Sequence, residues 1–419
     1  MKPFSRSWWG KFTRETDNLR KILLVKGILK DEIDQLHTFS DKVFLTSFKE
    51  PDDMIFRLWI NGERVFKETD WGGFLMKKEY KTIDEILASN PGILDFGIIQ
   101  NYCETLDEDF KLYVFEMFYH LFQTQGIPTH GNEVTLFAGN YSKTPIGFHL
   151  DQPGHRVIHL QIGPGVKEMY LIPKSIYENE LSFMTEGKPN FFEIEQLIPF
   201  ATKYIIEAGD LFYMPHGYYH VGRNIGFSKS VTIWLEDLTE EKLIDRLVLY
   251  LSSQIFKSEG NNVIPSDRSS IASTSFLYSR IKHLIRNDEG VLKLSVKDLI
   301  QRCLKEYKYL IASNNSYVPR PLRESGNSTS KVEWTEIVQV NSKYKLLVST
   351  NQKVLKVFWM GTSFSLPNSY SVRKIVRLIQ KGGSIKTQDL IATLHKDFDS
   401  ESSLEIINVL VKKKILLSR

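Results

Sequence analysis

Cysteine and long apolar runs are both scarce in this chain of 419 residues. Its two cysteines, Cys103 and Cys303, lie far apart without CxxC spacing, so we exclude a disulfide framework and a structural zinc site built from cysteines. No apolar run approaches the ~20 residues that a bilayer-spanning helix needs. The N-terminus also lacks the uninterrupted apolar core of a signal peptide. These absences predict a cytoplasmic protein that works in a reducing compartment without a membrane partner.

An excess of charge of one sign is missing too. The formal net charge is +4, which is too small to predict tight, sequence-independent binding to nucleic acid. Such binding needs clustered cations that neutralise phosphates. What the chain does have is 42% hydrophobic and 25% charged residues. That composition excludes general disorder and is sufficient for two or three domains with their own cores.

From about residue 130 to 237 the sequence is a series of short β-type runs separated by Gly, Pro and Asn. No helical crossover separates these runs, so they favour a jelly-roll barrel, mainly β with some α, over a parallel α/β sheet. The expected strands are Val134–Ala138, Val157–Ile162, Glu168–Ile172, Lys203–Glu207, Asp210–Met214 and Ser230–Leu235.

Helical spacing flanks this β region on both sides. Upstream, it predicts helices at Thr82 to Ala88 and at Asp107 to Gln123; in the second, the expected buried stripe is Phe110, Tyr113, Val114, Met117 and Leu121. Downstream, it predicts three helices that begin near Thr239, Ser270 and Ser295 and end by Ala312, with Thr239 as an N-cap. These helices must bury their apolar faces on the barrel, on each other or on another subunit.

A segment rich in Ser, Asn, Pro and Gly at 313–330 reads as a linker or long surface loop. Beyond it we expect a hairpin of Lys345–Ser349 and Val354–Trp359. Three short helices follow, and Ile415–Leu417 could close the domain as a strand. The three expected apolar faces are Val372, Ile375, Val376 and Ile379, then Leu390, Ile391 and Leu394, then Leu404, Ile407 and Val411. Three short helices with small β wings describe a winged helix.

Three residues within the β region have the composition of a metal site. His149 and Asp151 are two positions apart, so on a strand they face the same side. His220 follows a Gly-Asp turn and a strand that ends at Pro215, which favours a fixed position for its ring. Two histidines and one carboxylate on one face of a metal leave open positions for a co-substrate and O2, as in non-haem Fe(II) oxygenases.

Other histidines could compete as ligands. His216 lies four residues before His220, but the Met-Pro-His-Gly sequence opposes the helix that would bring the two together. His155 and His159 share a strand face and could line the interior. A fourth protein ligand would close the site and suit structural zinc, so we expect His159 to be a wall or core residue.

An Fe(II) oxygenase that uses 2-oxoglutarate needs a cation for the distal carboxylate of that co-substrate. Lys167, at the start of an expected strand, could supply it, with the hydroxyl of Thr144 or Thr232 sharing the carboxylate. A lysine after a Gly-Pro-Gly segment is more usually a solvated turn residue. Sequence position leaves both readings of Lys167 open.

Taken together, these motifs resemble the JmjC and cupin-like Fe(II)- and 2-oxoglutarate-dependent oxygenases, especially the ribosomal-oxygenase branch. The resemblance covers roughly residues 130 to 237 and is carried by Thr144-Pro145, His149-Leu150-Asp151, Gln161-Ile162, Lys167, Leu171-Ile172-Pro173, Gly209 to Pro215, His220 and Ser230 to Trp234.

The resemblance implies a double-stranded β-helix in which His149, Asp151 and His220 hold Fe(II) and Lys167 anchors 2-oxoglutarate. It also implies an oxygenase domain at 1–239, a helical dimerisation region at 240–312, a linker at 313–332 and a winged helix at 333–419. The implied reaction is hydroxylation of a side chain in a protein or a ribosomally made peptide, or demethylation if the carbon bears nitrogen.

A transcription regulator is the alternative, with a ligand-sensing barrel joined to a DNA-binding winged helix. The expected helix from Ser402 is poor in cations until Lys412, so it offers little phosphate neutralisation. We therefore expect no DNA partner and read the winged helix as a packing or protein-interaction module.

Overall fold

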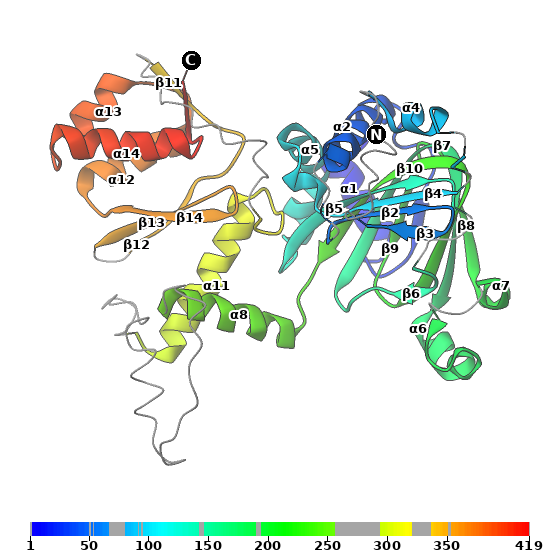
Figure 1. Cartoon of the computed structure of the whole chain (residues 1–419). Helices are drawn as coiled ribbons and strands as arrows, with labels where there is room; N and C mark the ends of the chain where they lie inside the picture. The colour runs from blue at the N-terminus through cyan, green and yellow to red at the C-terminus, as the bar shows by residue number, and fades with distance from the viewer. Residues whose placement is uncertain are drawn as a thin grey trace, which may run out of the picture. The chain divides into compact units, whose positions relative to one another are not determined.

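The computed structural model describes most of the chain, in two compact units (Figure 1). One unit contains residues 1–237 and 316–327, and the other contains 238–315 and 328–419. Within these units the described residues are 2–49, 52, 54–66, 80–90, 92–93, 95–141, 146–189, 194–255, 294–320, 337–350 and 353–418. Thr144 and the expected helix at Ser270 to Ile285 lie outside the described residues.

The first unit is a jelly-roll barrel of two antiparallel layers. Two long strands, β7 (His155–Pro173) and β10 (Tyr218–Glu236), pair with each other along their length and run through both layers. In one layer their order is β5 (Gly131–Gly139), second half of β10, first half of β7, β9 (Leu211–Met214). In the other it is β6 (His149–Leu150), first half of β10, second half of β7, β8 (Thr202–Ile206). This order is that of a double-stranded β-helix.

The prediction of separate strands at Val157–Ile162 and Glu168–Ile172 was wrong in one respect, because both belong to β7. The intervening glycine segment bends the strand between the layers and does not end it. At Gly165 a Cβ would lie 2.6 Å from the carbonyl oxygens of Ile225 and Phe227, so the strands approach too closely for a side chain. The other four expected strands lie at β5, β8, β9 and the second half of β10.

Side chains of the first layer alternate between a helix-covered face and the barrel interior. On the outer face, apolar residues pack in one core with α1 (Arg6–Glu15), α2 (Ile33–Lys49) and α5 (Glu108–Gln125). The inner face is buried and mixed: Thr135, His159, Gln161 and Thr232 are polar, whereas Val157 and Phe212 are apolar. The period of two along a strand therefore separates an apolar jacket from an interior that holds the buried polar groups.

Both predicted upstream helices are confirmed. They are α4 (Ile83–Ala88), with Thr82 as N-cap, and α5, with Asp107 as N-cap. Of the expected stripe in α5, all but the half-buried Tyr113 are fully buried. Short strands from the first hundred residues extend the first layer at both edges: β1 (Leu23–Val25) pairs with β9, while β4 (Phe96–Gln100), β2 (Phe56–Ile60) and β3 (Glu63–Val65) continue beyond β5.

An insertion between β7 and β8 covers the outside of the second layer. Its short helical pieces are α6 (Lys174–Ile176), η2 (Tyr177–Leu181), η3 (Ser182–Thr185), α7 (Ile194–Leu197) and η5 (Ile198–Phe200). Buried Tyr177 and Leu197 from this insertion pack against Tyr170 and Val221 of the layer. The barrel is thus covered on both sides.

Residues 316–320 return to the first unit as a strap along β5. Tyr317 forms a parallel bridge with Asn132, flanked by backbone hydrogen bonds of 2.9 and 3.0 Å. Its ring is fully buried and its hydroxyl donates to the carbonyl of Lys111 at 2.8 Å. The sequence predicted a surface linker here, and this part of it is buried instead.

The second unit begins with α8 (Glu240–Ile255) and α11 (Val296–Ser313), which confirm two of the predicted helices and the cap Thr239; Ser295 is the N-cap of α11. Two three-stranded sheets follow, of β12 (Leu347–Thr350), β13 (Val354–Trp359) and β14 (Thr362–Pro367), and of β15 (Ser384–Lys386), β11 (Ile337–Val340) and β16 (Leu416–Ser418). The predicted hairpin and closing strand are therefore confirmed.

Three helices complete this unit: α12 (Tyr370–Lys381), α13 (Thr387–Leu394) and α14 (Ser400–Lys412). In α14 the buried apolar residues are Ile406, Ile407 and Leu410, whereas Leu404 is exposed and Val411 half-buried, so the predicted face was partly wrong. The winged-helix assignment stays a prediction. Among the described helices of the whole chain, none has the length and apolar character of a membrane span.

A buried charged cluster joins the elements of the second unit. Glu306 of α11 is 1% exposed and accepts hydrogen bonds from Lys356 at 2.7 Å, Arg302 at 3.0 Å and Tyr250 at 2.7 Å. Lys356 lies on β13 and Tyr250 on α8. One carboxylate thus connects two helices and a sheet.

Candidate metal centre

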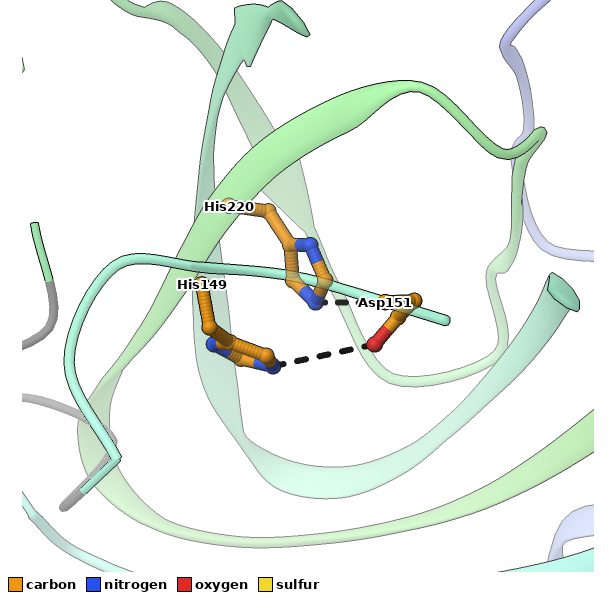
Figure 2. Close-up of side chains that lie close together, drawn as sticks. All are labelled: His149, Asp151 and His220. Carbon is orange, nitrogen blue, oxygen red and sulfur yellow. Dashed lines mark ion pairs between the residues drawn. The ribbon is translucent and has the colours of Figure 1, made fainter. Parts of the chain in front are cut away.

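The pairing of β6 with β10 brings the two distant parts of the predicted metal site together. His149 lies directly opposite His220 in this pairing, and Asp151 follows β6 by one residue. One ligand atom from each residue lies within 4.8 Å of the other two. As Figure 2 shows, the side chains converge on one space, with Asp151 oxygens 3.8 Å from Nε2 of each histidine.

Backbone carbonyls hold the orientation of both imidazoles. Nδ1 of His149 lies 2.9 Å from the carbonyl oxygen of Gly147, and Nδ1 of His220 lies 3.2 Å from that of Tyr218. A neutral ring that donates through Nδ1 leaves its Nε2 lone pair free for a metal. In both cases Nε2 is the atom that faces Asp151.

The electrostatics of the three residues fit a divalent cation. Burial lowers the pKa of His149 and of His220 to about 4, so both rings are neutral and able to ligate at neutral pH. Burial also raises the pKa of Asp151, whose Oδ2 is buried without a hydrogen-bond partner among the described residues. A bound metal ion would supply the partner that this oxygen lacks.

The competing histidines do not join this group. His159 points into the barrel, where its Nδ1 lies 3.0 Å from Thr232 Oγ1 and its Nε2 lies 3.2 Å from Gln161 Oε1. Both ring nitrogens are thus satisfied by protein, as expected for a wall residue. His155 and His216 lie near enough to affect the pKa of Asp151, but neither supplies a ligand atom to the group. Three protein ligands leave further coordination positions open.

Lys167 is a buried interior residue, so the reading as a solvated turn lysine was wrong. It lies on β7 opposite Asn224 of β10 and is 4% exposed. Its Nζ donates to the Tyr141 hydroxyl at 3.4 Å and lies 5.1 Å from the centre of the Phe137 ring. No carboxylate of the described chain lies within ion-pair distance of it. A buried cation without a counter-ion is costly, and an anionic ligand would offset that cost.

The hydroxyls near Lys167 differ from those that the sequence suggested. Thr232 is buried in the interior, where its hydroxyl lies 3.0 Å from His159 Nδ1, and Thr144 lies outside the described residues. Tyr141, which sequence reasoning missed, supplies the hydroxyl that the ammonium contacts. Its position two residues beyond the end of β5 was a weak signal, because only the strand register reveals what it faces.

The sequence resemblance implied a jelly-roll barrel whose interior holds two histidines and one carboxylate. The described residues have this arrangement. No family model matches the sequence, and no curated protein matches it. Solved structures of YcfD from Escherichia coli are similar along nearly the whole chain. One covers 97% of both chains at 12% identity with a TM-score of 0.47.

Two further structures name YcfD as a ribosomal oxygenase. One covers 95% of this chain and 94% of its own at 11% identity and a TM-score of 0.45. The other, a complex with cobalt and 2-oxoglutarate, covers 98% and 97% at 12% identity and a TM-score of 0.45.

Proposed function

We propose that this protein is an Fe(II)- and 2-oxoglutarate-dependent oxygenase that hydroxylates a side chain of a protein or a ribosomally made peptide. The observation that carries the proposal is the convergence of His149, Asp151 and His220 on one space inside a barrel. Lys167, a buried cation without a described counter-ion, adds a site for a co-substrate carboxylate.

Each residue has a defined task in this proposal. The two neutral imidazoles and the Asp151 carboxylate hold the iron and leave adjacent positions open. The bound iron supplies the redox chemistry by which O2, 2-oxoglutarate and a C–H bond give succinate, CO2 and an alcohol. The Lys167 ammonium and the Tyr141 hydroxyl orient 2-oxoglutarate through its distal carboxylate. Thr144 and Thr232 remain candidates for a second hydroxyl contact.

The barrel interior also restricts water. An apolar cluster between the layers contains Val157, Met169, Leu171, Phe212 and Met214. Low local polarity strengthens the charge-assisted hydrogen bonds of Lys167 and limits side reactions of a reactive centre.

The helical region of the second unit supports the proposal of a homodimer. No residue of α8 whose side chain is described is fully buried, and its Ile244, Val248 and Leu249 are 59, 57 and 64% exposed. A second copy of this helix would cover those side chains. Light scattering would test this: Val248→Asp should yield a monomer if the helix forms the interface, and an unchanged mass would contradict it.

Loss of the carboxylate ligand tests the activity. Asp151→Ala should abolish both Fe(II) binding, measured by calorimetry, and succinate formation from 2-oxoglutarate, because two histidines alone bind the ion weakly. His216→Ala is the matched control, since it removes a nearby histidine outside the ligand group. Normal iron binding and decarboxylation in Asp151→Ala would remove the proposal.

A further inference from the structure

Arg57 is a second cation that faces the barrel interior. It lies on β2 opposite Ile99 of β4, and Ile99 lies opposite Phe137 of β5. Paired residues of neighbouring strands project to the same side of a sheet. Phe137 flanks Lys167 in the interior, so Arg57 projects to the interior as well.

The guanidinium of Arg57 has few partners for a half-buried group. Its Nη2 donates to Asn101 Oδ1 at 2.8 Å, while its Nε is buried and has no hydrogen-bond acceptor. In the part of the chain that the structure describes, no carboxylate lies within 4.0 Å of it. Burial lowers the pKa of Arg57, which reflects the cost of keeping the charge there.

Glu133, the carboxyl that attracts Arg57, also attracts a second arginine. Glu133 and Glu236 hydrogen-bond to each other, and burial raises the pKa of both, so one proton shared between them leaves a single negative charge. Arg320 of the strap lies close to both carboxyls, and its guanidinium lies 3.5 Å from the centre of the Tyr102 ring. Arg57 and Arg320 therefore share the single negative charge of this pair, and one positive charge is left over.

Arg57 also lies beside the polar wall of the barrel interior. Asn101, which accepts its hydrogen bond, donates to Thr135 Oγ1 at 3.3 Å, and the buried Thr135 lies opposite Thr232. A ligand group bound to Arg57 would therefore lie in the same interior as the candidate metal ligands.

We propose that Arg57 is a substrate-positioning residue that binds a carboxylate of the polypeptide, so that the enzyme selects an acidic group beside the hydroxylated carbon. This inference rests on the proposed function. The planar guanidinium matches a carboxylate with two parallel hydrogen bonds, and the unpaired Nε is one of the donors such a pair uses. The carboxylate could belong to an Asp or Glu side chain or to the C-terminus of the substrate.

Peptide pools would test this selection. The Fe(II)-loaded protein is incubated with 2-oxoglutarate and dodecapeptide pools in which one central residue is fixed and the other positions are random. Pools fixed as Asp or Glu are compared with Asn, Gln, Arg and Lys pools, and each is made with a free and an amidated C-terminus. Mass spectrometry measures the +16 Da product, and succinate formation without peptide reports separately on the proposed function.

We expect at least a tenfold higher kcat/KM for acidic pools or for free C-termini, according to the source of the carboxylate. Arg57→Gln should reduce that preference to below threefold, and Arg57→Lys should restore part of it. Arg64→Gln, which removes a surface arginine of the neighbouring strand, should keep the preference and the peptide-independent succinate formation.

Three outcomes would overturn the inference while leaving the proposed function intact. The first is a preference for Arg or Lys pools that Arg57→Gln retains. The second is succinate formation with no product from any acidic pool or free C-terminus. The third is a rise in the KM for 2-oxoglutarate in Arg57→Gln without a change in peptide preference, which would place Arg57 at the co-substrate. Absence of succinate from the wild type would instead remove the proposed function.

Discussion

Lys167 and Tyr141 form a buried polar contact in the candidate co-substrate site. The ammonium is surrounded by two aromatic rings and one hydroxyl, and its charge also lowers the pKa of His159 and of His220. It thus lies near both the metal ligands and the polar wall of the interior. An anion placed between Lys167 and the metal would interact with positive charge at both ends.

Removal of this charge should act on co-substrate binding. Lys167→Met should raise the KM for 2-oxoglutarate at least thirtyfold, because a charge-assisted hydrogen bond to a buried carboxylate is worth about 2–3 kcal/mol. Tyr141→Phe should raise it about fivefold, since it loses one neutral donor. Steady-state succinate assays measure both constants. Equal KM values in the wild type and Lys167→Met would show that the carboxylate binds elsewhere.

The candidate metal ligands could be proposed from the sequence, whereas Tyr141 and Arg57 could not, for a physical reason. The two-residue spacing of His149 and Asp151 is a local property of a strand, and so is the turn before His220. Arg57 acquires its position from strand register between segments far apart in the chain, and the Tyr141 carbonyl accepts a hydrogen bond from the N–H of the distant Asn224. Nothing in their immediate sequence distinguishes them from exposed Tyr or Arg residues.

At the scale of elements, β7 and β10 determine the architecture. Each crosses from one layer to the other, and their pairing is irregular between Ile225 and Ser228, beside the bend at Gly165. The sequence predicted the halves of β7 but not their continuity. Gly-Pro-Gly usually ends a strand, and the close approach of the two backbones that keeps it within β7 is a tertiary contact.

Substitutions at two glycines near this bend distinguish the cost of a steric clash from the cost of a strained backbone dihedral angle. Gly165→Ala should lower the free energy of unfolding by about 2–4 kcal/mol, because its Cβ would clash with two backbone carbonyl oxygens. Gly226→Ala meets nothing within 4 Å and changes only a residue with φ of +75°. It should cost about 1–2 kcal/mol. Denaturant unfolding measures both losses of unfolding free energy. A loss below the predicted range in Gly165→Ala would indicate that the two strands move apart there without cost.

At the scale of the whole molecule, the order of segments along the chain does not match their division into the two units. Tyr317 follows α11 directly in sequence, yet its ring is buried in the barrel unit, whereas Glu306 of α11 stabilises the other unit. Hydrophobic periodicity could not reveal this, because a single buried tyrosine in a polar segment carries no period.

The two residues should therefore destabilise different units. Tyr317→Ala should lower the stability of the unit that contains the candidate metal site by about 3–4 kcal/mol through the cavity that it leaves. Metal binding during denaturant titration reports on that unit. Val354→Ala, at a half-buried position of the other unit, is the control and should leave this transition unchanged. An unchanged iron-binding midpoint in Tyr317→Ala would contradict the role of the strap.

Glu306→Gln should destabilise the second unit in a pH-dependent manner. Salt bridging to Lys356 lowers the pKa of Glu306 in the folded state even though burial opposes this. A carboxyl with a lowered pKa stabilises the fold above its unfolded pKa and loses that contribution as pH falls through the folded value. The difference in unfolding free energy, about 3 kcal/mol at pH 7, should shrink as pH falls below about 4. Calorimetric scans at pH 7 and below about pH 4 measure this difference in unfolding free energy. A pH-independent difference would contradict the stabilising role of the Glu306–Lys356 ion pair.

The two histidines of the candidate metal site have one further property with evolutionary consequences. Each ring is oriented by a carbonyl two residues earlier in its own strand or turn, from Gly147 and from Tyr218. Because a carbonyl belongs to every amino acid, substitution at position 218 changes a side chain without removing the acceptor. The side chain at such a position can therefore change during evolution while the orientation of the imidazole is kept.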